Sequence, residues 1–304
     1  MKPHVSVLLN ESIENLNIKE DGIYVDCTLG FAGHSSEILK RIKKGKLFAF
    51  DQDGEAINYS KKILGQISDN YEIINSNFKN LRDELHKRGI KKVDGILFDL
   101  GVSSVQLDDA KRGFSYHKDA TLDMRMNQNQ KLDAYKVVNE YSLEDLTRIF
   151  FEYGEEKYAK SIAKSIVNNR PINTTIELAE IIKSSVPEKY KRDSHPARKV
   201  FQAIRIEVND ELNVFEEALN DAIDMLDKNG RICVITFHSL EDRICKNTFK
   251  KESEVDKIYK GLPDIPDEYK PKLKLIKKIK PSEKELEDNN RSRSAILRVA
   301  EKIK

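Results

Sequence analysis

The chain has 304 residues, of which 39% are hydrophobic and 34% charged, and its formal net charge at neutral pH is +2. This length allows two domains, or one large domain with an insertion, with a buried core under a soluble surface. The near-neutral balance excludes nucleic-acid binding through overall charge, so any such binding needs local basic patches. The first apolar run, residues 5–9, is too short for a signal peptide or a membrane span. We therefore expect a cytoplasmic protein with no membrane partner.

The chain contains three cysteines, Cys27, Cys233 and Cys245. No two of them have the spacing of metal ligands, and Cys27 and Cys233 lie within apolar strand patterns. We interpret them as small buried hydrophobic residues in a reducing compartment.

Residues 22–34 (GIYVDCTLGFAGH) combine a strand pattern at 23–27, a glycine turn at 30–33 and the start of a helical pattern. This order is typical of the cofactor-binding corner of a doubly wound α/β domain. A second expected strand, residues 46–50, ends in Asp51, 21 residues after Gly30. Such folds place an acid there to accept hydrogen bonds from ribose hydroxyls. An ordinary βαβ turn without a ligand would have the same spacing.

The glycine turn favours a methyl donor over a dinucleotide. It holds only Gly30-x-x-Gly33, followed by His34, instead of the full G-x-G-x-x-G pattern. A pyrophosphate needs bare amides at the helix start. S-adenosylmethionine carries no phosphate, so it tolerates a bulkier loop.

Strand and helix patterns alternate through residues 1–104, with further strands expected at 71–74 and 93–97. Right-handed crossovers would make this sheet parallel, with a ligand crevice at the carboxyl ends of its strands. Four residues fall at such ends: Gly30, Asp51, Phe78 and Asp99. We therefore predict an α/β fold, a doubly wound class I (Rossmann-like) sheet.

The alternation stops between residues 105 and 207. Two capping boxes, Ser142-x-x-Asp145 and Thr174-x-x-Glu177, precede helical patterns there, and no strand pattern appears. The α/β pattern then resumes with a helix at 212–226, a turn at 228–230, a strand at 231–237 and two final strands at 272–279 and 295–300. The expected organisation is an α/β domain made of residues 1–104 and 208–304, with an all-helical insertion, residues 105–207.

Two strand ends carry candidates for chemistry. Asp99 closes the fourth strand, where a carboxylate can hold the cofactor's amino group or accept a proton, or can merely cap the next turn. Residues 237–243 (FHSLEDR) close the fifth strand. Ser239 fits a helix N-cap, and the acids after it favour the helix dipole. Capping leaves Phe237 and His238 unexplained, so we expect them to stack on a base or hydrogen bond to it.

Basic and aromatic residues gather at 189–205 and at 270–293. Charge runs are usually solvated faces. Two of them flanking a crevice, with Tyr190 and Phe201 nearby, suit a track for nucleic-acid phosphates. The alternative is that Arg198 and Arg205 pair with acids of the insertion's own helices.

Taken together, these motifs resemble the bacterial 16S ribosomal RNA cytosine-N4 methyltransferases over nearly the whole chain. The matching motifs are His4-x-x-Val7-Leu8-Leu9, Asp26-x-Thr28-x-Gly30-x-x-Gly33-His34, Asp51-x-Asp53, residues 99–108 (DLGVSSVQLD), 112–115 (RGFS), 122–126 (LDMRM), 201–209 (FQAIRIEVN) and 237–243, and Arg291-x-Arg293-Ser294. Some relatives have glycine where this chain has Ala32. Many other amino-methylating enzymes carry Asp/Asn-Pro-Pro-aromatic where this chain has Asp99-Leu100-Gly101.

The resemblance implies transfer of a methyl group from S-adenosylmethionine to the exocyclic N4 of a cytosine in 16S ribosomal RNA, within the small ribosomal subunit. It implies seven cofactor-binding positions: Ala32, Gly33, His34, Asp51, Phe78, Asp99 and Gln106. The amine must be oriented and must lose a proton, and Asp99 is the first candidate for that contact and His238 the second. No metal is predicted for this step, and the sequence leaves open whether the chain forms a homodimer.

Two other functions share parts of this pattern. A nicotinamide-dependent oxidoreductase would share the first βαβ unit, although the glycine pattern is incomplete for it. A non-catalytic ribosome-assembly factor would bind RNA through the basic insertion alone.

Overall fold

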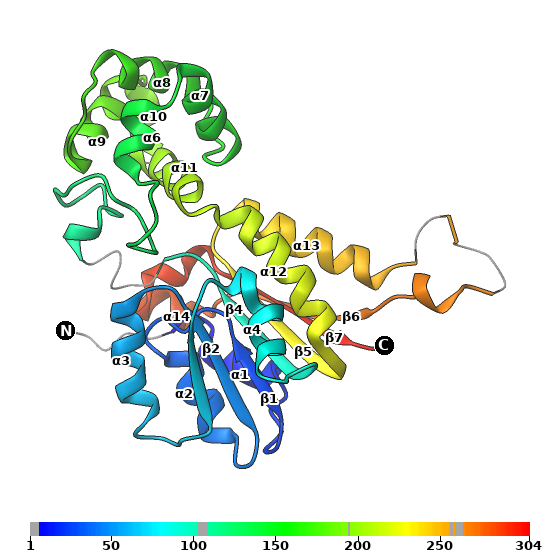
Figure 1. Ribbon diagram of the computed structural model, residues 1–304. Helices are drawn as coiled ribbons and strands as arrows, with labels where there is room; N and C mark the ends of the chain where they lie inside the picture. The colour runs from blue at the N-terminus through cyan, green and yellow to red at the C-terminus, as the bar shows by residue number, and fades with distance from the viewer. Residues whose placement is uncertain (1–5, 103–108, 194, 256–257, 260–263) are drawn as a thin grey trace. The chain divides into compact units, whose positions relative to one another are not determined.

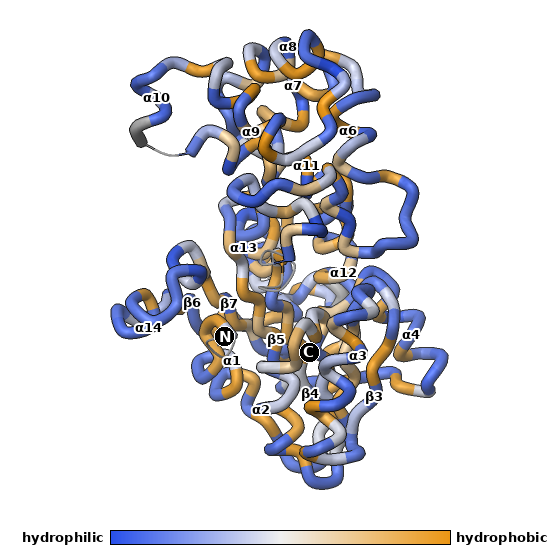
Figure 2. Tube along the Cα trace, turned by 90° about the vertical axis from the view of Figure 1, so that its left-hand side faces the viewer, coloured by the Kyte–Doolittle hydropathy of each residue, from blue (hydrophilic) through white to orange (hydrophobic). Residues whose placement is uncertain are grey.

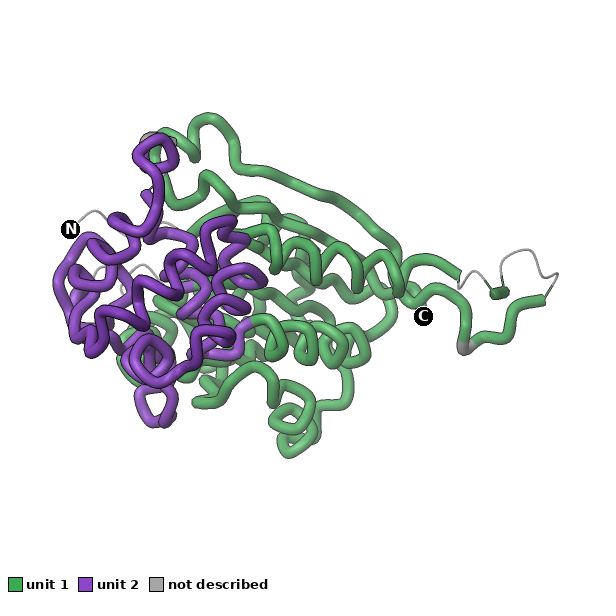
Figure 3. The backbone as a smooth tube through the Cα atoms, turned by 90° about the horizontal axis from the view of Figure 1, so that it is seen from above, with its two compact units in different colours: residues 1–101, 212–304 green, residues 102–211 purple. Residues whose placement is uncertain are grey.

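The computed structural model describes residues 6–102, 109–193, 195–255, 258–259 and 264–304, and Figure 1 shows its helices and strands. The chain divides into two compact units, coloured separately in Figure 3. Unit 1 consists of Met1–Gly101 and Leu212–Lys304, and unit 2 of Val102–Glu211. Each unit encloses hydrophobic clusters of its own, so each is described by itself.

Unit 1 is built on one seven-stranded sheet in the order β3-β2-β1-β4-β5-β7-β6. Its strands are β1 (Ile23–Asp26), β2 (Lys46–Asp51), β3 (Tyr71–Asn75), β4 (Val93–Asp99), β5 (Leu226–Thr236), β6 (Leu273–Ile279) and β7 (Ile296–Lys302). The first five are parallel, and β7 is antiparallel to both β5 and β6. The strand order reverses between β1 and β4, and ligands bind at the carboxyl ends of strands beside such a reversal. The predicted doubly wound fold is confirmed.

Helices cover both faces of this sheet. They are α1 (Leu9–Asn15), α2 (Gly33–Arg41), α3 (Gly54–Leu64), α4 (Leu81–Lys87), α12 (Glu211–Met225), α13 (Ser239–Ser253) and α14 (Glu283–Asp288). Alternate residues of β5 enter different clusters: Ile232 and Val234 join α12 and α13, whereas Cys233 and Ile235 join α1 and α2. The central strands read as continuous apolar runs because both of their faces are buried.

The turn predicted at residues 228–230 lies inside a strand. β5 begins at Leu226, which pairs with Val93, and the register shifts before Arg231 pairs with Gly95. Asn229 has a φ of 66°, and a Cβ on Gly230 would lie 2.8 Å from the carbonyl oxygen of Asp227. A polar Lys-Asn-Gly sequence reads as a turn, but here it forms an irregularity within a continuous strand.

Unit 2 consists of helices joined by long loops. They are α6 (Ala134–Glu140), α7 (Leu143–Glu152), α8 (Ala159–Asn168), α9 (Thr175–Ser184), α10 (Glu188–Asp193) and α11 (Ala197–Asn209). Both predicted caps form: the Ser142 hydroxyl accepts the Asp145 N–H, and Thr174 and Glu177 make a reciprocal capping box. In Figure 2, α7 and α8 alternate between hydrophobic and hydrophilic residues, as helices with one buried face do.

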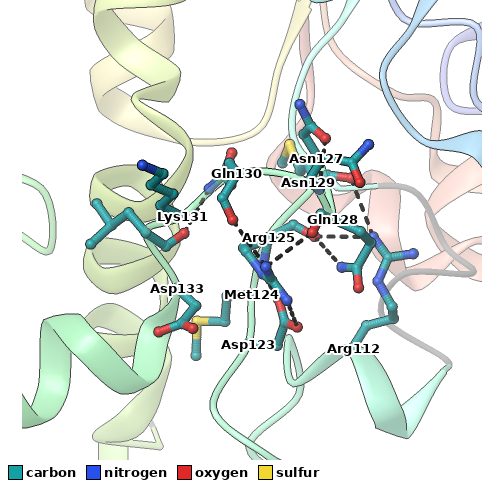
Figure 4. A network of polar contacts seen from close by, with 12 residues as sticks. Arg112, Asp123, Met124, Arg125, Asn127, Gln128, Asn129, Gln130, Lys131 and Asp133 are labelled. Atoms are coloured by element: carbon teal, nitrogen blue, oxygen red, sulfur yellow. Dashed lines mark hydrogen bonds and ion pairs between the residues drawn. The ribbon is translucent and has the colours of Figure 1, made fainter.

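The polar segment 122–130 is held by a network of hydrogen bonds, shown in Figure 4. Arg125 makes a two-point pair with the Asp123 carboxylate and donates to the carbonyl oxygens of Gln128 and Gln130. The Asn209 side chain on α11 accepts from the Met126 N–H at 2.8 Å and donates to the Met124 carbonyl at 2.8 Å. These bonds hold a segment without regular structure against a helix.

Within the described residues, no helix has the length and apolar character needed to cross a membrane.

Candidate active site

The carboxyl ends of the parallel strands gather carboxylates. Asp26, Asp51 and Asp99 are the last residues of β1, β2 and β4, and Glu241 lies in the first turn of α13, which follows β5. Asp26 and Glu241 are close enough to Asp99 that both act electrostatically on its carboxylate. The side chains that the sequence placed at separate strand ends therefore share one edge of the sheet.

The glycine turn between β1 and α2 has the backbone that a close ligand contact requires. Gly30 and Ala32 have φ values of 47° and 61°, and the Ser60 hydroxyl donates to the Gly30 carbonyl at 2.7 Å. A Cβ on Gly33 would lie 1.9 Å from the Ser6 Oγ and 3.1 Å from the Ser6 Cβ, so a larger residue there would have to displace the Ser6 side chain. Ala32 is fully buried in the cluster under α2, where its N–H donates to the Leu29 carbonyl and its own carbonyl accepts the Ser36 N–H, both at 2.8 Å.

Asp51 links two loops through its carboxylate. Its Oδ2 accepts the Gly30 N–H at 2.9 Å and its Oδ1 accepts the Asp53 N–H at 2.9 Å. Burial raises the pKa of Asp51 to about 6, and these backbone hydrogen bonds oppose that rise. A carboxylate oxygen can accept more than one hydrogen bond, so acceptor capacity remains for the hydroxyls of a ribose.

Phe78 lies just after β3, at the start of a short 3₁₀ helix (Phe78–Asn80). Phe78 is half-buried. Its ring packs edge-to-face on the ring of Phe98, and the two ring centroids are 5.6 Å apart. The neighbouring Asn77 donates to the side-chain oxygen of Gln52 at 3.3 Å. We did not predict a role for these two amides, although Gln52 directly follows β2 and Asn77 lies two residues after β3. They place polar groups beside both Asp51 and Phe78.

Asp99 is fixed through its backbone and leaves part of its carboxylate open. Its N–H donates to the Thr28 Oγ1 at 2.7 Å, and Thr28 in turn contacts the Asp26 carboxylate at 3.4 Å. The Nδ1 of His34 lies 3.5 Å from the Asp99 Oδ2. The Oδ1 is buried and has no hydrogen-bond donor among the described residues. Burial, and then the charges of Asp26 and Glu241, raise the pKa of Asp99 well above its ordinary value.

His238, and not Ser239, is the N-cap of α13. Its Nδ1 accepts the Glu241 N–H at 3.5 Å, and the Glu241 carboxylate accepts the Phe237 and His238 N–H groups at 2.8 and 3.3 Å. The Nε2 of His238 also lies 3.1 Å from the other Glu241 oxygen. The expectation that capping leaves His238 unexplained is therefore wrong. Histidine is an uncommon cap, so a cap preference alone selects the serine beside it.

This set of residues fits the charge of S-adenosylmethionine. The donor carries a sulfonium and an ammonium, and a buried carboxylate oxygen without a donor is stabilised by a nearby cation. A dinucleotide would instead bring a negatively charged pyrophosphate toward Asp26, Asp99 and Glu241. The electrostatics therefore favour the methyl donor, as the incomplete glycine pattern predicted.

The whole sequence decides the family. Residues 1–303 match the MraW methylase family. The chain belongs to that family. As an MraW methylase it is a methyltransferase that uses S-adenosylmethionine, so the family-level resemblance seen in the motifs is confirmed, and the nicotinamide-dependent oxidoreductase is excluded.

Similarity to solved structures is weaker. An rRNA methylase from Streptococcus thermophilus is 13% identical, with a TM-score of 0.44 over 97% of this chain and 93% of that one. A putative rRNA-methylase from Clostridium thermocellum is 13% identical, with a TM-score of 0.46 over 99% and 100%. A putative methyltransferase from Streptococcus mutans, in complex with SAH, is 12% identical, with a TM-score of 0.45 over 99% and 100%.

The remaining predicted residues have mixed positions. Gln106 lies outside the described residues. In the basic stretch of unit 2, Arg205 makes a two-point pair with Glu211 at 2.8 and 2.9 Å, and Lys199 donates to the Glu155 carbonyl. Lys191 pairs with Glu188. These contacts lie within unit 2, which ends at Glu211. The alternative interpretation expected acids of the insertion's own helices, residues 105–207, and Glu211 lies beyond them at the start of α12.

Proposed function

We propose that this methyltransferase transfers the methyl group of S-adenosylmethionine to the exocyclic N4 of a cytosine in 16S ribosomal RNA of the small subunit, in the cytoplasm. The observation that carries the proposal is the position and state of Asp99. It lies where the strand order reverses, and no described residue donates a hydrogen bond to its buried Oδ1. The Asp99 side chain as a whole is 25% exposed, so a cytosine amino group can donate to its carboxylate. The motifs shared with cytosine-N4 methyltransferases supply the identity of the base.

S-adenosylmethionine, when bound, supplies a methyl group on a positively charged sulfur. The cytosine amine is a poor nucleophile because its lone pair is delocalised into the ring, so its orientation matters. Asp99 accepts a hydrogen bond from the amine and holds it in one orientation. The raised pKa of Asp99 also suits it to accept the proton that N4 loses as the new N–C bond forms.

The other residues hold the donor and keep the site in shape. Asp51 accepts hydrogen bonds from the ribose hydroxyls, and Phe78 offers its exposed part as an apolar surface for a planar base. Gly33, with no Cβ, allows close approach to the main chain at the start of α2. His34, beside the Asp99 Oδ2, and Glu241, through its hold on the 237–238 backbone, position the edge of the sheet. His238 is placed by its cap, so we assign it a positioning role beside Asp99.

The decisive experiment is methyl transfer from labelled S-adenosylmethionine to small ribosomal subunits, followed by mapping of the modified base. With Asp99→Asn, turnover should fall by roughly 100-fold or more, because the shape is kept and the acceptor charge is lost. Asp94→Asn is the matched control, since Asp94 lies in the same strand with the same 25% side-chain exposure. Normal turnover of Asp99→Asn at saturating donor, with weaker donor binding, would limit Asp99 to holding the cofactor.

Selection of one base within a large folded RNA needs surface beyond the crevice, because phosphate contacts give both affinity and register. We assign this role to unit 2, which the sequence predicted as residues 105–207. Since Lys191, Lys199 and Arg205 have partners within unit 2, RNA contacts there depend on other residues.

A further inference from the structure

Unit 2 carries a group of stacked rings that the methyl-transfer site does not use. Tyr116 and His195 are stacked, with centroids 4.6 Å apart and planes 23° apart. His117 packs on Tyr116 at 4.3 Å and lies 5.6 Å from His195. The inner edge of the group rests on Phe201, which is buried and lies 5.5 Å from Tyr116. We call Tyr116, His117 and His195 the ring stack.

The ring stack is exposed although it stands on the core of unit 2. His117 and His195 are exposed and Tyr116 is half-buried. Core packing explains the position of Tyr116, because its ring packs on the buried Phe201. It does not explain the two imidazole rings, which are exposed to solvent. Exposed planar rings are the platforms on which unpaired nucleic-acid bases stack.

The backbone that follows Tyr116 and His117 is hydrogen-bonded to α9. The hydroxyl of Thr175, in the first turn of α9 and fully buried, donates to the Lys118 carbonyl at 2.7 Å and accepts the Ala120 N–H at 3.1 Å. The Thr175 N–H donates to the Ala120 carbonyl at 2.9 Å. These bonds fix the backbone that directly follows Tyr116 and His117, and a fixed backbone lowers the entropy that a ligand must overcome on binding.

Two cations, Arg198 and Lys183, lie near the ring stack. Arg198, exposed on α11, acts electrostatically on Tyr116, and no ion pair or side-chain hydrogen bond is found for it among the described side chains. Lys183 on α9 lies near His195, and the acid Glu180 stands 3.6 Å from that lysine. An unpaired guanidinium beside exposed rings complements a ligand with both planar bases and phosphates.

We propose that the ring stack and Arg198 bind an unpaired stretch of the RNA substrate, with a base stacked on the imidazole rings and a phosphate on Arg198. This rests on the proposed function for the identity of the RNA as ribosomal. The ring stack would thus help unit 2 select single-stranded RNA, since a base within a duplex does not expose its face.

His195 also has a structural contact, and the test separates the two roles. Its Nδ1 accepts the Ala197 N–H at 3.2 Å, at the start of α11. His195→Asn keeps a side-chain acceptor for that N–H and removes the ring, whereas His195→Phe keeps a ring and removes the acceptor. Lys164→Gln, which removes one positive charge from an exposed position on α8, controls for charge alone.

The experiment measures fluorescence anisotropy of a short fluorescein-labelled oligoadenylate with the full chain. This probe has no cytosine, so it is not a methyl acceptor in the proposed function. His195→Asn should weaken binding by at least about fivefold, and His195→Phe should bind like the parent. Arg198→Gln should weaken binding and lower the slope of log affinity against log salt by about 0.7, and Lys164→Gln should change neither by as much.

Equal binding by His195→Asn and the parent, or equal loss in His195→Asn and His195→Phe, would overturn this inference. The proposed function is tested apart from it, on small subunits. Ring-dependent binding of oligoadenylate by a chain that methylates no ribosomal RNA would refute the proposed function and support the ring stack. Methylation of ribosomal RNA by a chain whose oligoadenylate binding does not depend on the His195 ring would support the proposed function and refute the ring stack.

Discussion

At the scale of single residues, Asp51 is both the proposed hydrogen-bond acceptor for the ribose of the cofactor and a carboxyl group with a raised pKa. Because its pKa rises from 3.8 to about 6 in the folded chain, the folded state holds the proton more tightly than the unfolded state. Asp51 therefore favours folding at low pH, and that contribution is lost as the pH rises through about 6. The ionised form, which accepts hydrogen bonds best, predominates above that value.

We predict that affinity for S-adenosylmethionine falls as the pH drops through about 6, measured by calorimetric titration. Asp51→Asn should bind the donor with little dependence on pH in this range. Asp51→Ala should weaken binding by about 1.5–3 kcal/mol, the range for hydrogen bonds to a charged group. Asp94→Asn is again the control and should follow the parent's profile. A pH profile unchanged by Asp51→Asn would remove Asp51 from the cofactor site.

The strand ends were predictable from sequence because a short strand followed by glycine or an acid gives a local signal. That signal placed Asp51 and Asp99 at one edge of the sheet. Contacts between residues far apart in the sequence give no such local signal. The hydrogen bond between the Asp99 N–H and the Thr28 hydroxyl, for example, could not be predicted from either residue's neighbours. His238 was misjudged for a related reason, since its cap depends on Glu241 turning back toward it, and Ser239 satisfies the usual preference at the same place.

At the scale of elements, the segment 122–130 depends on α11 for its structure. The buried Asn209 side chain serves the Met126 N–H, the Met124 carbonyl and the Arg205 carbonyl. The sequence of this segment has no apolar period that would predict a helix or a strand. Its order comes instead from hydrogen bonds to a helix more than 80 residues away along the chain.

We predict that Asn209→Ala lowers the free energy of unfolding by about 1–3 kcal/mol for each backbone group left buried and unpaired. Asn220→Ala is the control, because the Asn220 side chain is exposed on α12 and donates only to the Glu216 carbonyl one turn earlier. Chemical denaturation compares the two variants. Equal, small losses in both would show that solvent replaces the hydrogen bonds of Asn209.

At the scale of the whole molecule, the chain has two units with separate hydrophobic clusters. A ligand stabilises the parts of a protein that must be folded in order to bind it. The described residues of the proposed cofactor site all lie in unit 1, at the ends of β1, β2, β3 and β4.

We predict that S-adenosylhomocysteine slows amide hydrogen exchange in segments 23–34, 47–54, 74–80 and 95–101 of unit 1. Exchange in α7, α8 and α9 of unit 2 should be unchanged, since these helices have their own buried faces. Hydrogen exchange with mass spectrometry resolves these segments. Slower exchange in α7–α9 on binding would mean that the cofactor site extends into unit 2.

The three cysteines report on the unfolding of unit 1 alone. Cys27 directly after β1, Cys233 in β5 and Cys245 in α13 are all buried in unit 1, and burial raises the pKa of each thiol. Thiol reagents attack the exposed thiolate, so the folded chain should resist alkylation and react only as unit 1 opens. The sequence puts no cysteine in residues 102–211. Unfolding of unit 2 alone should therefore leave the alkylation rate unchanged, although the helical circular dichroism signal falls. Pulsed alkylation should thus follow the unfolding of unit 1 separately from that of unit 2.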